Sequence, residues 1–170
     1  GFDIDFAKAV AEEAGYKAEI THVGWDPLFV EVDSGRAQAG VSAVSISEER
    51  QEQYEFSVPY FLSTNKILVP EGSTIKNSAD LEGKKVAVLN GSTGMMAVEK
   101  VLGINNKNIK KFENNVLAIQ ELKQNGVDAV VADGAVVDEY VKNNPNDNFV
   151  VIEDASNFDS EFYGVIFQKG

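Results

Sequence analysis

Hydrophobic and polar positions alternate in the first part of the chain in a pattern that predicts a helix followed by a strand–helix–strand unit. From Phe2 to Ala14 the apolar residues recur at every third or fourth position, which predicts an amphipathic helix. Residues 18–23 and 39–44 are short apolar runs, and we expect strands there. Between them, the Asp-Pro pair of WDPLFVEVD predicts a helix that ends at about Asp33.

The alternation becomes more regular from residue 66 onwards. Strands that alternate with helices are typical of α/β sheets, so the predicted fold class is α/β. Two extended segments bracket this second part, and we expect two sheets joined by them. The predicted strands are residues 66–69, 85–89, 109–112, 128–132, 149–153 and 162–168, and the predicted helices are residues 93–102, 116–124 and 135–143.

Composition narrows the classes of function. The chain has 170 residues, of which 44% are hydrophobic, enough for a substantial core. Its net charge of −12 argues against nucleic acid and against anionic membrane surfaces as partners. Cysteine is absent and His22 is the only histidine, which excludes disulfides and zinc sites built from Cys and His. We therefore expect no metal ion and no cofactor.

Polar residues follow the predicted strands, at the edge of a parallel sheet where ligands bind. The segment VSAVSISEER runs from an apolar strand into serines, and Arg50 follows Ser47 within one helical turn. A planar guanidinium beside hydroxyl and N–H donors is suited to a carboxylate. In the alternative interpretation Ser47 only caps a short helix and Arg50 is a solvated surface charge.

Three more strand ends carry candidate residues. After Leu89 the sequence NGSTG opens a helix, where Ser92 or Thr93 either caps the helix or contributes to a nest of N–H groups that binds an anion. It lacks the spacing of a nucleotide-binding loop. Asp133 either caps the next helix or accepts hydrogen bonds from an ammonium group, and Trp25 is either a core residue or the wall of a cleft.

Together these residues match the chemistry of a free amino acid. An arginine and an N–H nest suit its carboxylate, an aspartate suits its ammonium group, and an aromatic wall suits its side chain. No paired carboxylates at useful spacing and no Ser-His-Asp set are evident in the sequence, so we expect a binding protein and not an enzyme.

The opening segment GFDIDFAKAVAEEA resembles the signature of the family 3 bacterial extracellular solute-binding proteins, the amino-acid receptors of ABC importers. The resemblance continues through GWDPL, VSAVSISEER, ADLEGKKVAVLNGSTG, VDAVVADGAVV and FYGVIFQKG, so it extends over essentially the whole chain. It implies a two-lobed, type II periplasmic-binding fold, in which each lobe is a sheet flanked by helices and the ligand is enclosed between the lobes.

On this resemblance, residues 1–65 with 162–170 form the first lobe and residues 70–158 the second. Residues 66–69 and 162–168 are then the hinge strands. Members of the family usually have a strand ahead of GFDID and further helices after the second hinge strand. We therefore expect the first lobe to be incomplete at both ends.

The resemblance also implies roles for individual residues. Arg50 resembles the arginine that pairs with the ligand carboxylate, and Ser45 and Thr93 resemble further donors to it. Asp133 resembles the acceptor for the ligand ammonium group, and the backbone carbonyl of Ala43 resembles a second acceptor.

Two residues bear on the identity of the amino acid. Trp25 resembles the aromatic lining of the side-chain pocket. Leu89 stands where glutamine-binding members of the family carry a lysine, and a leucine there resembles the branch that binds Lys, Arg or His. With the acidic charge of the chain, a cationic amino acid is favoured and glutamine is the main alternative.

The resemblance further implies a periplasmic or extracellular location at the cell envelope and a membrane permease of an ABC importer as partner. The same fold also serves as a sensor domain of membrane kinases, as the receptor domain of ligand-gated channels, and as an enzyme such as cyclohexadienyl dehydratase. These alternatives remain open at this point.

Overall fold

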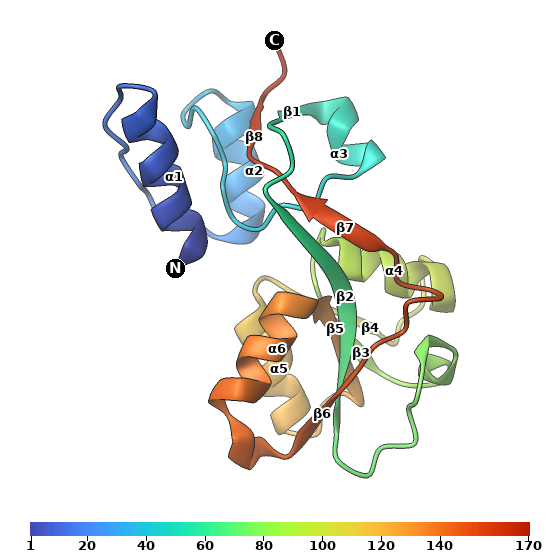
Figure 1. The fold of residues 1–170 in the computed structure, drawn as a ribbon. Coiled ribbons are helices and arrows are strands. Elements are labelled where there is room, and N and C mark those ends of the chain that lie inside the picture. Colours follow the sequence, from blue (N-terminus) through green and yellow to red (C-terminus); the bar gives the residue numbers. More distant parts are fainter. The chain divides into compact units, whose positions relative to one another are not determined.

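The computed structural model describes residues 1–170, which form two compact units (Figure 1). The first unit consists of Gly1–Leu62 and Phe162–Gly170, and the second of Ser63–Glu161. The chain passes from the first unit to the second within strand β2 (Phe61–Pro70) and returns within strand β7 (Ser160–Tyr163). These two strands pair with each other.

The second unit is built on a mixed sheet with the strand order β4-β3-β5-β2-β6. Strands β3 (Val86–Leu89), β4 (Ile109–Phe112) and β5 (Ala129–Asp133) are parallel, whereas β2 runs antiparallel to β5 and to β6 (Phe149–Ile152). β3 is buried along its whole length and β5 is buried up to its last residue. The sequences of both strands are almost entirely apolar because helices cover both faces of the sheet.

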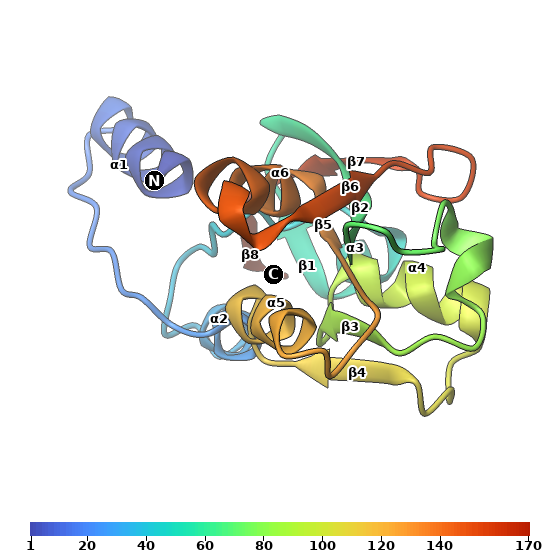
Figure 2. The same cartoon turned by 90° about the horizontal axis from the view of Figure 1, so that it is seen from below.

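Three α-helices and two short 3-10 helices complete the second unit. Helices α4 (Thr93–Leu102), α5 (Asn115–Lys123) and α6 (Gly134–Asn143) follow β3, β4 and β5 respectively, while the 3-10 helices are η1 (Ser78–Leu81) and η2 (Pro145–Asp147). In both ribbon views α5 and α6 lie on one side of the sheet and α4 on the other (Figure 1, Figure 2). The helix predicted over residues 93–102 is confirmed.

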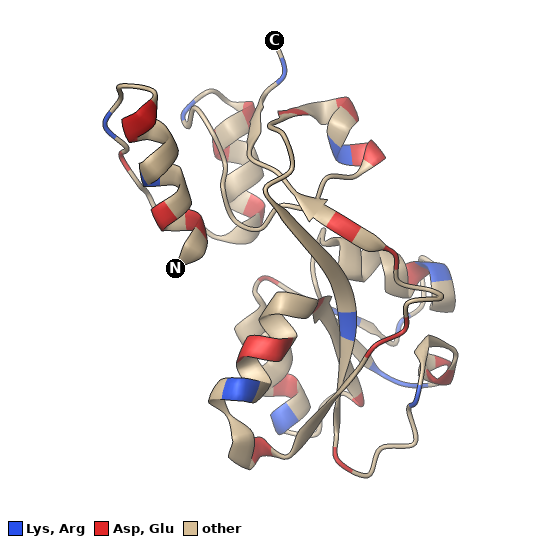
Figure 3. Cartoon of the chain, in the orientation of Figure 1, with Lys and Arg blue, Asp and Glu red and all other residues tan.

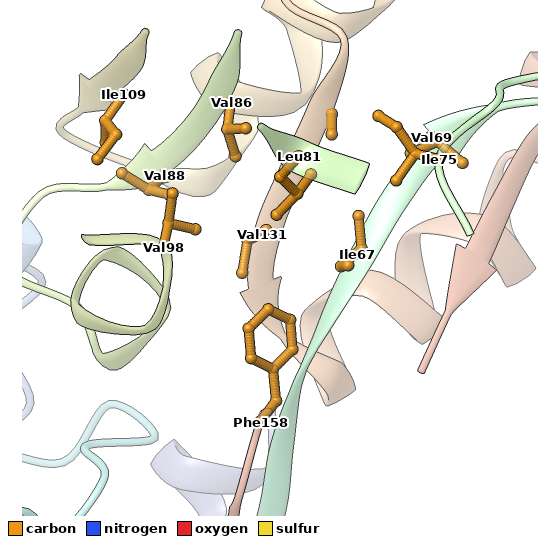
Figure 4. Packing of buried hydrophobic residues seen from close by; sticks show 11 residues of the cluster. Ile67, Val69, Ile75, Leu81, Val86, Val88, Val98, Ile109, Val131 and Phe158 are labelled. Carbon is orange, nitrogen blue, oxygen red and sulfur yellow. The ribbon is translucent and has the colours of Figure 1, made fainter. Parts of the chain in front are cut away.

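Alternate strand residues enter two separate apolar clusters, one on each face of the sheet. Complete burial of one such side chain contributes about 1.5–3 kcal/mol, so these clusters are the main source of stability of the second unit. The cluster on the α4 side is shown in Figure 4 and consists of Ile67, Val69, Ile75, Leu81, Val86, Val88, Val98, Ile109, Ala129, Val131 and Phe158. The cluster on the other face consists of Leu68, Ala87, Ala118, Ile119, Leu122, Val127, Val130, Ala132 and Val137.

The first unit has less regular structure and a smaller core. Helices α1 (Phe2–Glu13), α2 (Trp25–Asp33) and α3 (Glu48–Gln53) are accompanied by a two-stranded antiparallel sheet of β1 (Tyr54–Phe56) and β8 (Ile166–Gln168). No residue of α1 is buried. The buried apolar cluster of this unit is Val32, Val44, Tyr54 and Ile166.

The two strands predicted in the first unit do not form. Residues 18–23 adopt no regular structure, and the segment 39–44 is reduced to an isolated bridge from Gly40 to Ile166, with a second bridge from Ser45 to Tyr163 directly after it. In the second segment the reason lies in the backbone of Ala43, whose φ of 47° leaves the extended region and interrupts the ladder. An apolar run predicts a strand only where a partner also takes up its N–H and C=O groups.

Candidate functional site

Arg50 is buried in the first unit at the end of the serine-rich turn. The Ser47 hydroxyl caps α3 by accepting a hydrogen bond from the Arg50 N–H at 3.2 Å, so the capping interpretation of Ser47 is confirmed. The Arg50 residue itself is only 6% exposed, and its Nη1 donates to the Ser45 carbonyl at 2.9 Å. The alternative in which Arg50 is a solvated surface charge is therefore wrong.

Two aromatic rings hold the guanidinium of Arg50. Its Cζ lies 5.3 Å from the centre of the Trp25 ring and 5.4 Å from the centre of the Phe29 ring. The two rings meet edge to face with their centres 5.0 Å apart. Trp25 is the first residue of α2 and is half-buried, and its indole N–H is buried without a hydrogen-bond partner. Trp25 thus packs in the first unit and at the same time faces the arginine.

Ala43 lies on the same turn and is held by an aspartate from α1. Its backbone N–H donates to Asp3 Oδ2 at 2.6 Å, and the Tyr60 hydroxyl donates to Asp3 Oδ1 at 2.8 Å. The positive φ of Ala43 is uncommon for a residue with a Cβ and occurs mainly where surrounding contacts enforce it. Asp3 belongs to the GFDID motif, but no local pattern in the sequence points to these two contacts.

In the second unit the NGSTG turn joins β3 to α4. Ser92 is the N-cap of α4, since its hydroxyl accepts from the Met95 N–H at 3.0 Å, and it donates to the Leu89 carbonyl at 2.6 Å. Thr93 is not the cap: its hydroxyl donates to Glu161 Oε2 at 2.7 Å and accepts from Asn65 Nδ2 at 3.2 Å. Leu89 ends β3 and is 9% exposed.

Asp133 ends β5 and is the N-cap of α6. Its Oδ1 accepts from the Ala135 N–H at 3.0 Å and from the Ser63 hydroxyl at 2.9 Å. The capping interpretation of Asp133 is therefore confirmed, and its charge is favourable at the positive end of the helix dipole.

The second unit brings its candidate residues to one edge of the sheet. β3 and β5 are adjacent and parallel, with Val88 paired to Val131, so the NGSTG turn and Asp133 follow neighbouring strand ends. Helices α4 and α6 both begin at this edge, and the positive ends of their dipoles favour an anion there. The candidate residues of the first unit lie on two short segments: Trp25 on α2, and Ala43, Ser45 and Arg50 on the serine-rich turn. The contact between Arg50 and the Trp25 ring joins the two segments.

Acidic residues are spread over both units and are not gathered on one element (Figure 3). The basic residue of β2, Lys66, lies between two of them, with Nζ 2.7 Å from Asp138 and 2.8 Å from Glu153. The hydrogen bond to Asp138, followed by that to Glu153, raises the pKa of Lys66. No group of three or more His, Cys, Asp or Glu side chains is placed to hold a metal ion. None of the helices combines the length and the apolar character needed to cross a membrane.

Comparison with known proteins identifies relatives that are all described as solute-binding or amino-acid-binding proteins. The sequence profile of the bacterial extracellular solute-binding proteins, family 3, matches residues 1–142. The probable histidine-binding protein of Neisseria gonorrhoeae is 42% identical over 173 residues, which cover 100% of this chain and 63% of that protein. The chain thus spans less than two thirds of the length of this relative.

Solved structures agree with these relatives. The arginine-, lysine-, histidine-binding protein ArtJ from Geobacillus stearothermophilus is 50% identical, with a TM-score of 0.98 over 100% of this chain and 73% of that one. An ancestral arginine-binding protein bound to glutamine is 42% identical, with a TM-score of 0.91 over 100% of this chain and 74% of that one. The predicted α/β periplasmic-binding fold is confirmed by these matches. The chain belongs to the family 3 bacterial extracellular solute-binding proteins.

Proposed function

We propose that the protein binds a free L-amino acid and that a cationic one, arginine, lysine or histidine, is favoured. The observation that carries this proposal is the buried Arg50, held by the Ser45 carbonyl and by the rings of Trp25 and Phe29 at the end of a serine-rich turn. A fixed guanidinium offers a planar fork of donors that matches the two oxygens of a carboxylate.

One set of candidate residues binds the carboxylate of the amino acid and a second set binds its ammonium group. Arg50 pairs with the α-carboxylate, and the hydroxyls of Ser45 and Thr93 donate to it. Asp133 and the Ala43 carbonyl accept hydrogen bonds from the α-ammonium group. Support comes from the chemistry of each residue, from the fixed geometry within each unit, and from the position of each residue in the family motifs.

Ser92 and Leu89 complete the set in the second unit. Ser92 belongs to the N-terminus of α4, whose N–H groups and dipole favour the carboxylate. Leu89 and Trp25 supply apolar surface to the aliphatic stem or ring of the ligand side chain.

The preference for a cationic ligand is supported by the net charge of −12 and by two relatives named for histidine or for arginine, lysine and histidine. Glutamine is the second candidate, because an ancestral arginine-binding protein of the same fold has been solved with glutamine bound.

We propose that the protein acts in the periplasm or outside the cell and delivers its ligand to the permease of an ABC importer, and the description of its family as extracellular solute-binding proteins supports this. No chemical step is part of this function. We further propose that residues 1–65 with 162–170 and residues 70–158 act as two lobes, with residues 66–69 and 162–168 as the hinge strands between them. Support comes from β2, which includes residues 66–69, and from β7, which includes residues 162 and 163, because the chain passes between the units within these two strands.

The test is a thermal-shift screen of the twenty amino acids, followed by calorimetry on those that stabilise the protein. A ligand at a hundred times its dissociation constant stabilises the folded protein by about 2.7 kcal/mol, which gives a clear shift. We expect shifts with arginine, lysine or histidine. No shift with any of the twenty would refute the proposed function.

A further inference from the structure

The hydroxyl of Thr93 is occupied on both sides within the second unit. It donates its single proton to Glu161 Oε2 at 2.7 Å and accepts a hydrogen bond from Asn65 Nδ2 at 3.2 Å. Asn65 is 4% exposed, and its Oδ1 would lie 3.2 Å from a Cβ at Gly94, so this glycine leaves the space in which the amide packs. The buried amide fixes the accepting side of the hydroxyl, and the proton is directed at Glu161.

Glu161 presents to Thr93 the same chemical group that a free amino acid would present. Its carboxylate accepts from the hydroxyl at a distance typical of a charge-assisted hydrogen bond. Glu161 is the acidic residue of β7, and this strand carries a red segment in Figure 3. It lies 68 residues after Thr93 in the sequence. β7 is also the strand within which the chain leaves the second unit.

We propose that Glu161 is an internal competitor for the ligand carboxylate at Thr93. This inference rests on the proposed function, in which the Thr93 hydroxyl donates to the α-carboxylate. A hydroxyl has one proton, so it cannot donate to Glu161 and to the ligand at once. Ligand binding must break the hydrogen bond between Thr93 and Glu161, and the two carboxylates repel each other when both approach the hydroxyl. Glu161 therefore weakens binding, and ligand binding releases a side chain of β7.

The test is a double-mutant cycle with L-arginine as the probe, measured by calorimetry on Glu161→Ala, Thr93→Val and the double variant. Removal of Glu161 frees the hydroxyl proton, and we expect arginine to bind at least about threefold more tightly. Thr93→Val removes the donor while keeping the shape, and we expect weaker binding. In the Thr93→Val background the Glu161→Ala change should give a smaller gain in affinity, because the shared proton is gone and only the repulsion between the two carboxylates is relieved.

Two controls separate competition from a structural role of Glu161. Ser160→Ala alters the neighbouring residue of β7, whose Oγ accepts from the Thr64 hydroxyl at 3.3 Å, and should leave affinity unchanged. L-Argininamide keeps a carbonyl oxygen that can accept from Thr93 but lacks the charge of the carboxylate, so Glu161→Ala should give a smaller gain with this probe than with arginine. If Glu161→Ala melts below the assay temperature, Glu161→Gln keeps the shape of the side chain and removes the charge, and the gain should persist in reduced form.

The outcomes distinguish the competition by Glu161 from the proposed carboxylate site. If Thr93→Val weakens binding while Glu161→Ala leaves it unchanged or weaker, the competition is refuted and the proposed carboxylate site stands. An equal gain with arginine and argininamide would also refute the competition. If Thr93→Val leaves arginine binding unchanged, or wild-type protein does not bind arginine, the carboxylate contact at Thr93 is wrong, and this inference is wrong with it.

Discussion

Replacement of Arg50 by methionine should abolish most ligand binding while the protein stays folded. The change removes the charge of a residue that is 6% exposed and keeps most of its aliphatic volume. Truncating one partner of a buried charge pair costs about 2–5 kcal/mol of binding free energy, which corresponds to a loss in affinity of roughly thirtyfold to several thousandfold.

The effect on stability is expected to be much smaller because opposing terms nearly cancel. The variant loses the hydrogen bond to the Ser45 carbonyl, worth about 1.5–3 kcal/mol, and the ring contacts at 5.3 and 5.4 Å, worth about 0.5–2 kcal/mol each. It also no longer has to bury a cation, whose removal from water costs several kcal/mol, and this gain offsets the lost contacts. We expect the free energy of unfolding to change by less than about 2 kcal/mol.

The assay is calorimetric titration with the natural ligand, paired with urea denaturation. Arg36→Met is the matched control, because the side chain of Arg36 is 58% exposed and pairs with Glu31 at the surface, where an ion pair is worth about 0–1 kcal/mol. The control should bind like the wild type. Binding by Arg50→Met within threefold of the wild type would refute the assignment of Arg50 to the carboxylate.

Three further predictions concern the other parts of the chain. Asp133→Asn keeps an oxygen that can cap α6 but removes the charge, so affinity measured by calorimetry should fall strongly while stability changes by less than about 1 kcal/mol; a lower melting temperature with unchanged affinity would contradict the ammonium contact. Hydrogen bonds from Ser78, Ser156 and Asn157 lower the pKa of Asp154, so the stability that this carboxylate contributes is present above its unfolded pKa of about 3.9 and is lost as the pH falls towards its folded pKa. Denaturation between pH 6 and pH 2 should therefore show a smaller acid-induced loss for Asp154→Asn, and equal losses would contradict this assignment. Amide exchange should be faster in residues 18–44 than in residues 85–132, because few of the former are buried and the latter include the buried strands β3 and β5; equal protection would contradict the difference in core size.

The sequence predicted the second unit well because its signals are local. Apolar runs such as Val86–Leu89, turns at Gly91 and capping residues such as Ser92 and Asp133 lie within a few residues of the elements they define. The helix over Thr93–Leu102 was predicted with the bounds that the structure has.

The first unit was predicted less well because its contacts join distant segments. Asp3 holds the N–H of Ala43 across 40 residues and the hydroxyl of Tyr60 across 57, and no local pattern reveals these partners. The positive φ of Ala43, which interrupts the predicted strand, is equally invisible in an apolar run. The same limit applied to Glu161, whose partner Thr93 is 68 residues away.

The candidate residues themselves came from chemistry at strand ends and from the family motif. The structure settles which of them cap helices, Ser47, Ser92 and Asp133, and which are buried, Ser45, Arg50 and Leu89. Their contacts with a ligand stay predictions until binding is measured.

The most direct test of the central claim is a competition assay in which arginine, lysine, histidine, glutamine, glutamate and leucine displace a bound radiolabelled amino acid from the protein. The account predicts that one of the three cationic amino acids binds most tightly, since the chain carries a net charge of −12 and Leu89 and Trp25 offer apolar surface to a long stem or ring. Glutamate should bind most weakly. Displacement by glutamate or leucine at lower concentration than by arginine, lysine and histidine would contradict the account.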